Sequence, residues 1–385
     1  MGLPAALRYK VVVFWLVFVS VFLFFAYAPL PERIDALRDA AVNTAADTVR
    51  PYRPNGQQWQ PTTLKDSNAK YAYATFLAGN AEDAEKDVYF LGARLLAYQL
   101  IHASETRSNT SIPFIVMVTK TVSEAKKDRL QRDGAIVVVV EDLVADWIAG
   151  RDPINPRFKD VMTKLRLWEL TQFDRICLID GDTVLMENID GVFGDPAVNT
   201  RTTLDKPNAI RDDEAPQPTE YAFASTAEPS MTLRTPIPRS KLCSEDADSV
   251  RQEINHDFPP SEEKQQYQFG PNYLNSGFIV FQPSTDMFAY YVSLLDKSDG
   301  RWGEGLPEQN LLNWAHRRPK GNMPWQTLDR MWNIHFPTVQ DMEAGVKSLH
   351  EKFWNPEHKD LRPYLEKYKW RMLGYFEGLA ARTSV

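Results

Sequence analysis

The chain has 385 residues, with 44 Lys and Arg against 51 Asp and Glu and a formal net charge of −7. Charged residues make up 25% and hydrophobic residues 43% of the sequence, which is typical of a globular protein and excludes a disordered or collagen-like chain. The acidic balance argues against nucleic acid as a partner, and the two cysteines, Cys177 and Cys243, are too few for a disulfide framework.

One apolar segment near the N-terminus has the properties of a membrane anchor. Residues 11–28 are 18 residues without a charge, and a helix of that length covers about 27 Å, close to the thickness of a bilayer core. Basic residues precede it, so the positive-inside rule places residues 1–10 in the cytosol and the rest in the lumen. A cleaved signal peptide is the alternative, since Ala26 and Ala28 fit a cleavage site. We expect the uncleaved, single-pass type II anchor, because the apolar run exceeds the usual signal-peptide length.

Between this anchor and the body, residues 29–70 are predicted to form a lumenal stem. An Ala-rich stretch is followed there by prolines among polar residues, a composition that interrupts regular structure. Further along, Asn109 begins the triplet Asn-Thr-Ser, which is an acceptor for N-linked glycan. The sequence therefore predicts a lumenal, membrane-anchored glycoprotein.

From residue 71 to residue 385 the pattern predicts one α/β domain. The expected strands are residues 73–77, 114–118, 136–140, 176–179 and 274–281, and the expected helices are residues 87–104, 123–132 and 160–171. Nearly continuous apolar strands that alternate with helices are typical of a parallel sheet covered on both faces. Residues 195–272 are rich in proline and charge, and we expect most of them to form long loops over the active-site face.

Two carboxylates follow the apolar strand that ends at residue 179. Asp180 and Asp182 are one residue apart, and such a pair at the carboxyl end of a strand can bind a hard divalent cation. The alternative is an ordinary Asp-Gly turn. The sequence has no phosphate-binding glycine loop, so a bound diphosphate would need a metal and basic side chains. Lys164 is a candidate for this role, although a solvated helix lysine is the commoner case.

Three further positions carry polar groups in apolar surroundings. Asn275 opens an Asn-Ser-Gly segment inside an expected strand, where it either contacts a sugar hydroxyl or marks a β-bulge. Glu308 and Gln309 begin an expected helix, where they either face the reacting carbon or favour the helix start. His350 lies two residues before Lys352, which combines a metal ligand with a phosphate-binding cation. Of the other histidines, we expect His102 and His335 to be core or surface residues.

Six motifs follow one another in a fixed order: residues 73–77, 163–168, 179–183 with 188–190, 275–277, 308–309, and 350–354. Together they resemble the retaining glycosyltransferases of family 8, the glycogenin and galactinol synthase group, over residues 71–356. The resemblance implies a single GT-A domain, Mn²⁺ as cofactor and a UDP-sugar as donor.

Carried over to this sequence, the resemblance makes Asp180, Asp182 and His350 the metal ligands, and Glu308 and Gln309 the catalytic residues. The implied donor-binding residues, for uridine, phosphates and sugar, are Ala74, Thr75, Phe76, Leu77, Lys164, Asp180, Asn275 and Lys352.

The sequence departs from the family pattern in three places. A single residue separates His350 from Lys352, Glu308 replaces an aspartate, and the loop before Asn275 is long, which indicates a different acceptor. The anchor suggests the fungal Golgi α-N-acetylglucosaminyltransferases as a subgroup, a location in the Golgi membrane and a glycan acceptor. Two alternatives remain at this point. One is a haloacid-dehalogenase-like phosphatase with Asp180 as nucleophile, and the other is an anchored glycan-binding protein without catalysis.

Overall fold

A computed structural model of the chain describes residues 50–51, 69–80, 83–145, 160–207, 209–228, 272–295, 297, 299–302 and 306–383. The predicted tail, the anchor at residues 11–28 and nearly all of the predicted stem lie outside these described residues, as does Cys243. Among the described residues, none of the helices combines the length and the apolar character needed to cross a membrane.

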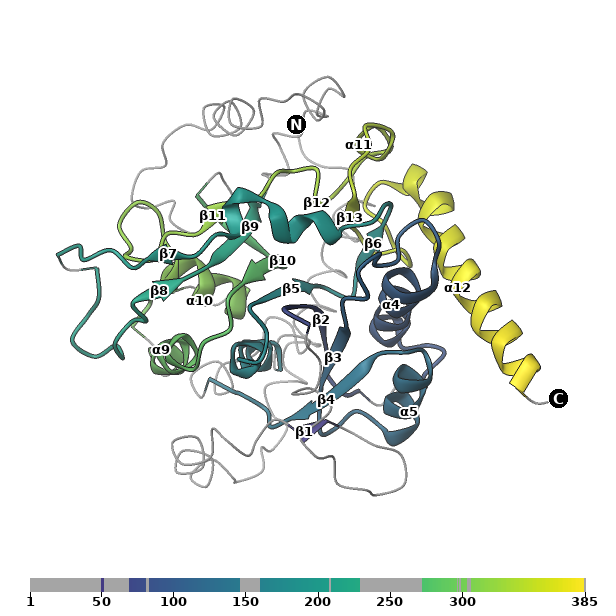
Figure 1. Cartoon of the computed structure of the whole chain (residues 1–385), viewed down its shortest axis with the longest axis horizontal. Coiled ribbons are helices and arrows are strands. Elements are labelled where there is room, and N and C mark those ends of the chain that lie inside the picture. The colour runs from purple at the N-terminus through teal and green to yellow at the C-terminus, as the bar shows by residue number, and fades with distance from the viewer. Residues whose placement is uncertain are drawn as a thin grey trace, which may run out of the picture.

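A mixed sheet of eight strands forms the centre of the protein (Figure 1). Its order is β1-β4-β3-β2-β5-β10-β9-β11. The bounds are Arg50–Pro51 (β1), Tyr71–Leu77 (β2), Phe114–Thr119 (β3), Ile136–Val140 (β4), Arg175–Ile179 (β5), Phe223–Ala227 (β9), Leu274–Phe281 (β10) and Gln326–Thr327 (β11). Strands β4, β3, β2 and β5 are parallel, as the apolar runs predict, whereas β10 is antiparallel to both β5 and β9.

Helices cover both faces of this sheet (Figure 1). On one face lie α9 (Thr285–Leu295), α10 (Pro307–Ala315) and the 3₁₀-helix η3 (Val161–Glu169). On the other face lie α4 (Val88–Ala97) and α5 (Glu124–Arg132). Alternate residues of each strand enter the two cores, so that Leu178 packs on the first face and Cys177 and Ile179 on the second. Cys177 is a free, buried thiol, as its apolar surroundings predict.

Two predicted helices differ from expectation in their geometry. The segment expected to be one helix over residues 87–104 is α4 followed by a π-helical turn, η1 (Tyr98–His102). The segment at residues 160–171 is a 3₁₀-helix rather than an α-helix. Its three residues per turn align Met162, Leu165 and Trp168, all of which are at most 1% exposed in the core. Packing has therefore selected the tighter helix.

A second, three-stranded sheet lies beside the end of β5. It consists of β6 (Thr183–Leu185), β13 (Ser348–His350) and β12 (Ile334–His335), and it packs with α4 and the long C-terminal helix α12 (Arg362–Thr383). In Figure 1, α12 runs along the outer side of α4, away from the central sheet. The remaining short elements are η4 (Asp190–Gly194), η5 (Pro196–Val198), β7 (Arg201–Thr202), β8 (Glu220–Tyr221), α11 (Val339–Glu343) and η7 (Lys359–Leu361).

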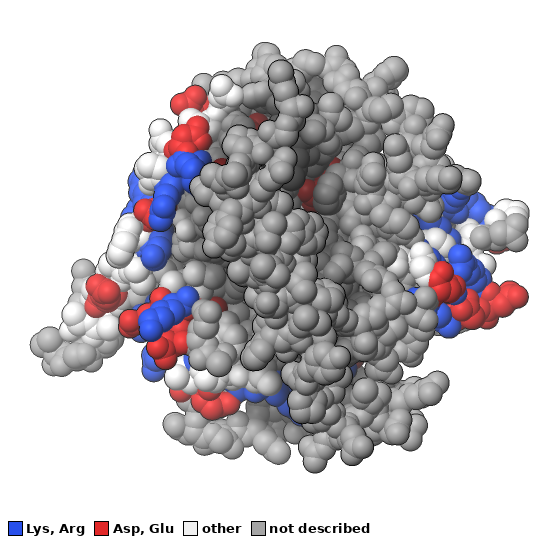
Figure 2. All heavy atoms as spheres, turned by 180° about the vertical axis from the view of Figure 1, so that it is seen from behind, with Lys and Arg blue, Asp and Glu red and all other residues white. Residues whose placement is uncertain are grey.

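The stretch expected to be mainly loops, residues 195–272, contributes to the fold where it is described. It supplies β9 to the central sheet and the antiparallel pair β7–β8, while residues 229–271 lie outside the described part. On the face shown in Figure 2, acidic and basic side chains of the described residues lie next to one another rather than in separate patches. Salt bridges such as Arg211 with Asp299, at 2.8 Å, belong to the same pattern of mixed charge.

Candidate active site

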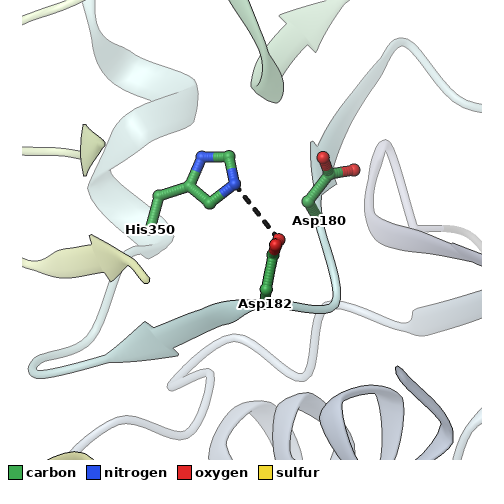
Figure 3. Close-up of side chains that lie close together, drawn as sticks. All are labelled: Asp180, Asp182 and His350. Atoms are coloured by element: carbon green, nitrogen blue, oxygen red, sulfur yellow. Dashed lines mark hydrogen bonds and ion pairs between the residues drawn. The ribbon is translucent and has the colours of Figure 1, made fainter. Parts of the chain in front are cut away.

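Three predicted metal ligands converge at the carboxyl end of β5. Asp180 and Asp182 follow that strand directly, and β6 begins at the next residue. Strand β13 pairs with β6 so that His350 lies opposite Thr183, which brings the imidazole to the carboxylates. Nε2 of His350 is 3.1 Å from Oδ1 of Asp182, and one ligand atom from each of the three residues lies within 4.8 Å of the others (Figure 3).

The chemistry of this cluster fits a divalent cation. Two carboxylates and one imidazole form an oxygen and nitrogen set that suits Mn²⁺ and similar metals. Burial raises the pKa of Asp182, but the charge and hydrogen bond of His350, with Lys352 and His335, outweigh this and hold it well below its usual range. Burial by itself lowers the pKa of His350, but the charge and hydrogen bond of Asp182 outweigh burial, so that the pKa of His350 is raised. In the protein alone, each of these two groups therefore favours the charged form of the other.

Lys164 is buried and connects the metal cluster to α10. Its Nζ is 2.7 Å from Oδ1 of Asp180 and 3.1 Å from Oε1 of Glu308, and its side chain is 11% exposed. Burial lowers the pKa of Lys164, but the two carboxylates outweigh this effect and raise it. The alternative that Lys164 is a solvated helix lysine is therefore wrong. Lys352 differs, because its side chain is 35% exposed and its Nζ lies 3.5 Å from Oδ2 of Asp182.

The first turn of α10 faces this buried cluster. Glu308 and Gln309 are both buried, and Oε1 of Gln309 accepts a hydrogen bond of 2.8 Å from the backbone N–H of Ser276. The Ser276 hydroxyl lies 3.1 Å from Oε1 of Glu308 and 3.0 Å from Oε1 of Gln309. Glu308 is therefore more than a helix-start acid, since it is held by a lysine and a hydroxyl inside the protein.

The Asn-Ser-Gly segment forms a bulge in β10. Between two paired positions β10 advances five residues, from Leu274 to Ile279, while β9 advances only two, from Ala227 to Ser225. Asn275 stabilises this bulge, because its Oδ1 accepts from the backbone N–H of Gly277 at 2.9 Å. Its Nδ2 donates to a carboxylate oxygen of Glu228, and the residue is 2% exposed. The bulge, which the sequence left open as the alternative to sugar binding, is present, and the contact of Asn275 with a sugar stays a prediction.

Gly277 is required by its contact with the metal cluster. A Cβ at this position would lie 2.1 Å from Cε1 of His350, far inside van der Waals contact. The backbone carbonyl of Gly277 also accepts a hydrogen bond of 2.8 Å from the backbone N–H of Asp180. The glycine thus lets β10 approach both the histidine and the strand end that carries the aspartates.

The predicted uridine-binding residues lie in and at the end of β2. Ala74 and Thr75 are fully buried, Leu77 is 2% exposed, and Phe76 is half-buried. Because Ala74 pairs with Leu178 in the parallel register, the last residues of β2 run beside the segment that leads to Asp180. Their contact with a nucleotide stays a prediction.

The motif at residues 188–190 has a structural role near the predicted glycosylation site. Asp190 accepts a hydrogen bond of 2.8 Å from the Tyr73 hydroxyl and another of 2.8 Å from the backbone N–H of Asn109. These bonds fix the exposed turn that carries the Asn-Thr-Ser triplet.

Two residues of this region escaped the sequence analysis. His335, expected to be a core or surface residue, stacks on His350 with ring centroids 4.5 Å apart. Its Nδ1 is 2.6 Å from Oε1 of Glu228, which is 2% exposed. Burial raises the pKa of Glu228, and His335 outweighs this and lowers it. Neither residue belongs to a recognisable motif, so only their apolar neighbours in the sequence could have drawn attention to them.

Comparison with known proteins gives relatives but no matching family model. The chain is 29% identical over 314 residues to the uncharacterized protein C5H10.12c of Schizosaccharomyces pombe, and the aligned region covers 78% of each chain. It is 23% identical over 316 residues to galactinol synthase 10 of Arabidopsis thaliana, covering 75% of this chain and 79% of that one. With galactinol synthase 1 of Solanum lycopersicum it shares 32% identity over 132 residues, covering 34% and 37%.

Similar solved structures include mouse xyloside xylosyltransferase 1, with a TM-score of 0.40 and 13% identity over 74% of this chain and 99% of that one. Another is the bifunctional glycosyltransferase WbbM, with a TM-score of 0.43 and 15% identity. The match covers 78% of this chain and half of the WbbM chain. The relatives named galactinol synthase support a sugar-transferring enzyme of the glycosyltransferase class.

Proposed function

We propose that the protein is a metal-dependent retaining glycosyltransferase that moves a sugar, GlcNAc, Glc or Gal, from a UDP-sugar to a glycan acceptor. The observation that carries this proposal is the convergence of Asp180, Asp182 and His350 beside the buried pair of Lys164 and Glu308. The similarity to galactinol synthases supports the same class of reaction.

The proposed mechanism assigns the charged side chains to the two ends of the breaking bond. Mn²⁺ held by Asp180, Asp182 and His350 would supply positive charge for the diphosphate leaving group. Lys352, which is partly exposed beside Asp182, would add a second positive charge there. Glu308 would stabilise the oxocarbenium-like carbon of the donor sugar while its bond to UDP breaks and the acceptor oxygen bonds on the same face, with the acceptor hydroxyl proton passing to the departing phosphate oxygen. Because these interactions are strongest in the transition state, they accelerate transfer rather than only tighten binding.

The proposal includes a place in the cell. The uncharged segment at residues 11–28 and the Asn-Thr-Ser triplet at Asn109 support a type II protein of the Golgi membrane with a lumenal catalytic domain. The long segment at residues 195–272 would choose the glycan acceptor.

The decisive experiment is a donor screen on the full-length chain in detergent. The protein is incubated with Mn²⁺ and each UDP-sugar in turn, and released UDP is measured with and without candidate glycans. We expect one donor to give UDP release that excess EDTA abolishes and that Asp182→Asn loses, because an amide removes a negative charge from the metal site. Activity that persists in EDTA would contradict a metal-dependent transferase. Release of phosphate from a phosphate monoester, with no UDP from any donor, would favour the phosphatase instead.

A further inference from the structure

Among the described residues, none makes the hydrogen bond to His350 that usually orients a metal-binding histidine. Its Nε2 faces Asp182, while its Nδ1 is buried and has no hydrogen-bond partner within the part of the chain that the structure describes (Figure 3). Metal-bound histidines almost always donate their second N–H to a carboxylate, a carbonyl or water, which fixes the ring. Within the described residues, other contacts hold the ring in its orientation.

Ring packing supplies one of these contacts. The imidazole of His335 lies against that of His350 with centroids 4.5 Å apart and an angle of 28° between the planes. The contact follows from strand pairing, because His335 of β12 is the register partner of His350 of the parallel strand β13. The backbone of Gly277 makes a second close contact with the same ring.

His335 is itself held in place by a buried carboxylate. Oε1 of Glu228 is 2.6 Å from Nδ1 of His335, and the other carboxylate oxygen accepts from Nδ2 of Asn275. Glu228 is 2% exposed, and its backbone N–H donates to the carbonyl of Tyr273 at 2.8 Å. The carboxylate therefore ties His335 to the base of the β10 bulge.

We propose that Glu228 and His335 are positioning residues for the metal site. Glu228 fixes the ring of His335, and that ring holds the imidazole of His350 in its metal-binding orientation by stacking, in place of a hydrogen bond to Nδ1. This inference rests on the metal site of the proposed function.

The test measures Mn²⁺ affinity of the full-length protein directly, without turnover. Free Mn²⁺ is followed by electron paramagnetic resonance during titration, and the melting temperature of each variant is recorded in parallel. His335→Ala removes the stacked ring, and His335→Phe restores a planar ring without the nitrogen atoms. His102→Ala is the control, since His102 also packs against an aromatic ring, that of Tyr375 on α12, with the two ring planes tilted by 34°.

We expect His335→Ala to raise the Mn²⁺ dissociation constant by about 10-fold or more, the usual effect of losing such a support. His335→Phe keeps a stacked ring but loses the hydrogen bond to Glu228, so it should weaken Mn²⁺ binding less than His335→Ala, and His102→Ala should stay close to the wild type. Glu228→Asp shortens the side chain and so draws the carboxylate back from His335. We expect it to weaken Mn²⁺ binding without unfolding the chain. This variant therefore tests the inference if His335→Ala does not fold.

Two results would overturn the inference alone. One is wild-type Mn²⁺ affinity in His335→Ala or, where that variant does not fold, in Glu228→Asp. The other is a loss in His335→Phe as large as that in His335→Ala, which would exclude stacking as the cause. Failure of the wild type to bind Mn²⁺ would overturn the metal site and the inference together.

Discussion

Lys164 gives the most quantitative test of the site. Lys164→Met keeps the length and apolar stem of the side chain and removes its charge. Two carboxylates, those of Asp180 and Glu308, then lose a cation at 2.7 and 3.1 Å. Breaking one partner out of a buried ion pair typically costs about 3–5 kcal/mol, because the remaining charge stays buried without compensation.

That free energy corresponds to a measurable change in melting temperature. In a large domain 1 kcal/mol shifts the melting temperature by about 2 °C or somewhat more, so we expect Lys164→Met to melt roughly 6–10 °C below the wild type in metal-free buffer. The matched control is Lys352→Met. Lys352 contacts a carboxylate of the same cluster at 3.5 Å but is 35% exposed, and a solvated pair of this kind contributes at most about 1 kcal/mol.

The assay is thermal unfolding of the full-length protein in detergent, with and without Mn²⁺. Added Mn²⁺ should stabilise Lys164→Met more than the wild type, because Asp180 is no longer neutralised by the lysine and ligand binding to the folded state raises its stability. Equal melting temperatures for Lys164→Met and Lys352→Met would refute the reasoning, since burial would then have no energetic effect on this ion pair.

Three other predictions concern catalysis, pH and topology. Glu308→Gln should lower kcat by about 100-fold or more while UDP affinity is nearly unchanged, because the lost charge acts on the transition state; kcat close to the wild type, or a product of inverted anomeric configuration, would contradict this role. Burial lowers the pKa of His316 from its ordinary value of 6.5 to about 3, so between these pH values the unfolded chain binds a proton that the folded chain does not, and stability falls as the pH drops. Between pH 7 and pH 4 the free energy of unfolding should therefore fall less steeply with pH in His316→Phe than in the wild type, by about 1.4 kcal/mol per pH unit. Equal slopes in the two proteins would disprove the assignment. Carbonate extraction should leave the protein in membranes and Asn109→Gln should increase its gel mobility, whereas a soluble form without residues 1–28 would show cleavage instead of anchoring.

Local sequence patterns were sufficient to predict the strands that carry the site. The run of apolar residues in β5 predicts a buried strand because burial on both faces leaves no place for polar side chains. Asp180 and Asp182 follow at its end, and the bulge at Asn275 is visible because Asn-Ser-Gly interrupts another such run. Each of these predictions depends on residues adjacent in the chain.

The family resemblance predicted that His350 meets Asp180 and Asp182, and the tertiary structure decided the other contacts between distant side chains. Lys164 looks like a surface lysine until η3 places it against Glu308, 144 residues away. His335 belongs to a strand of two residues, Ile334–His335, which is too short to show any periodicity, and Glu228 reaches it from 107 residues earlier. Strand register and burial fix such contacts, because they depend on how whole elements pack, and a sequence pattern reports only on neighbours within one element.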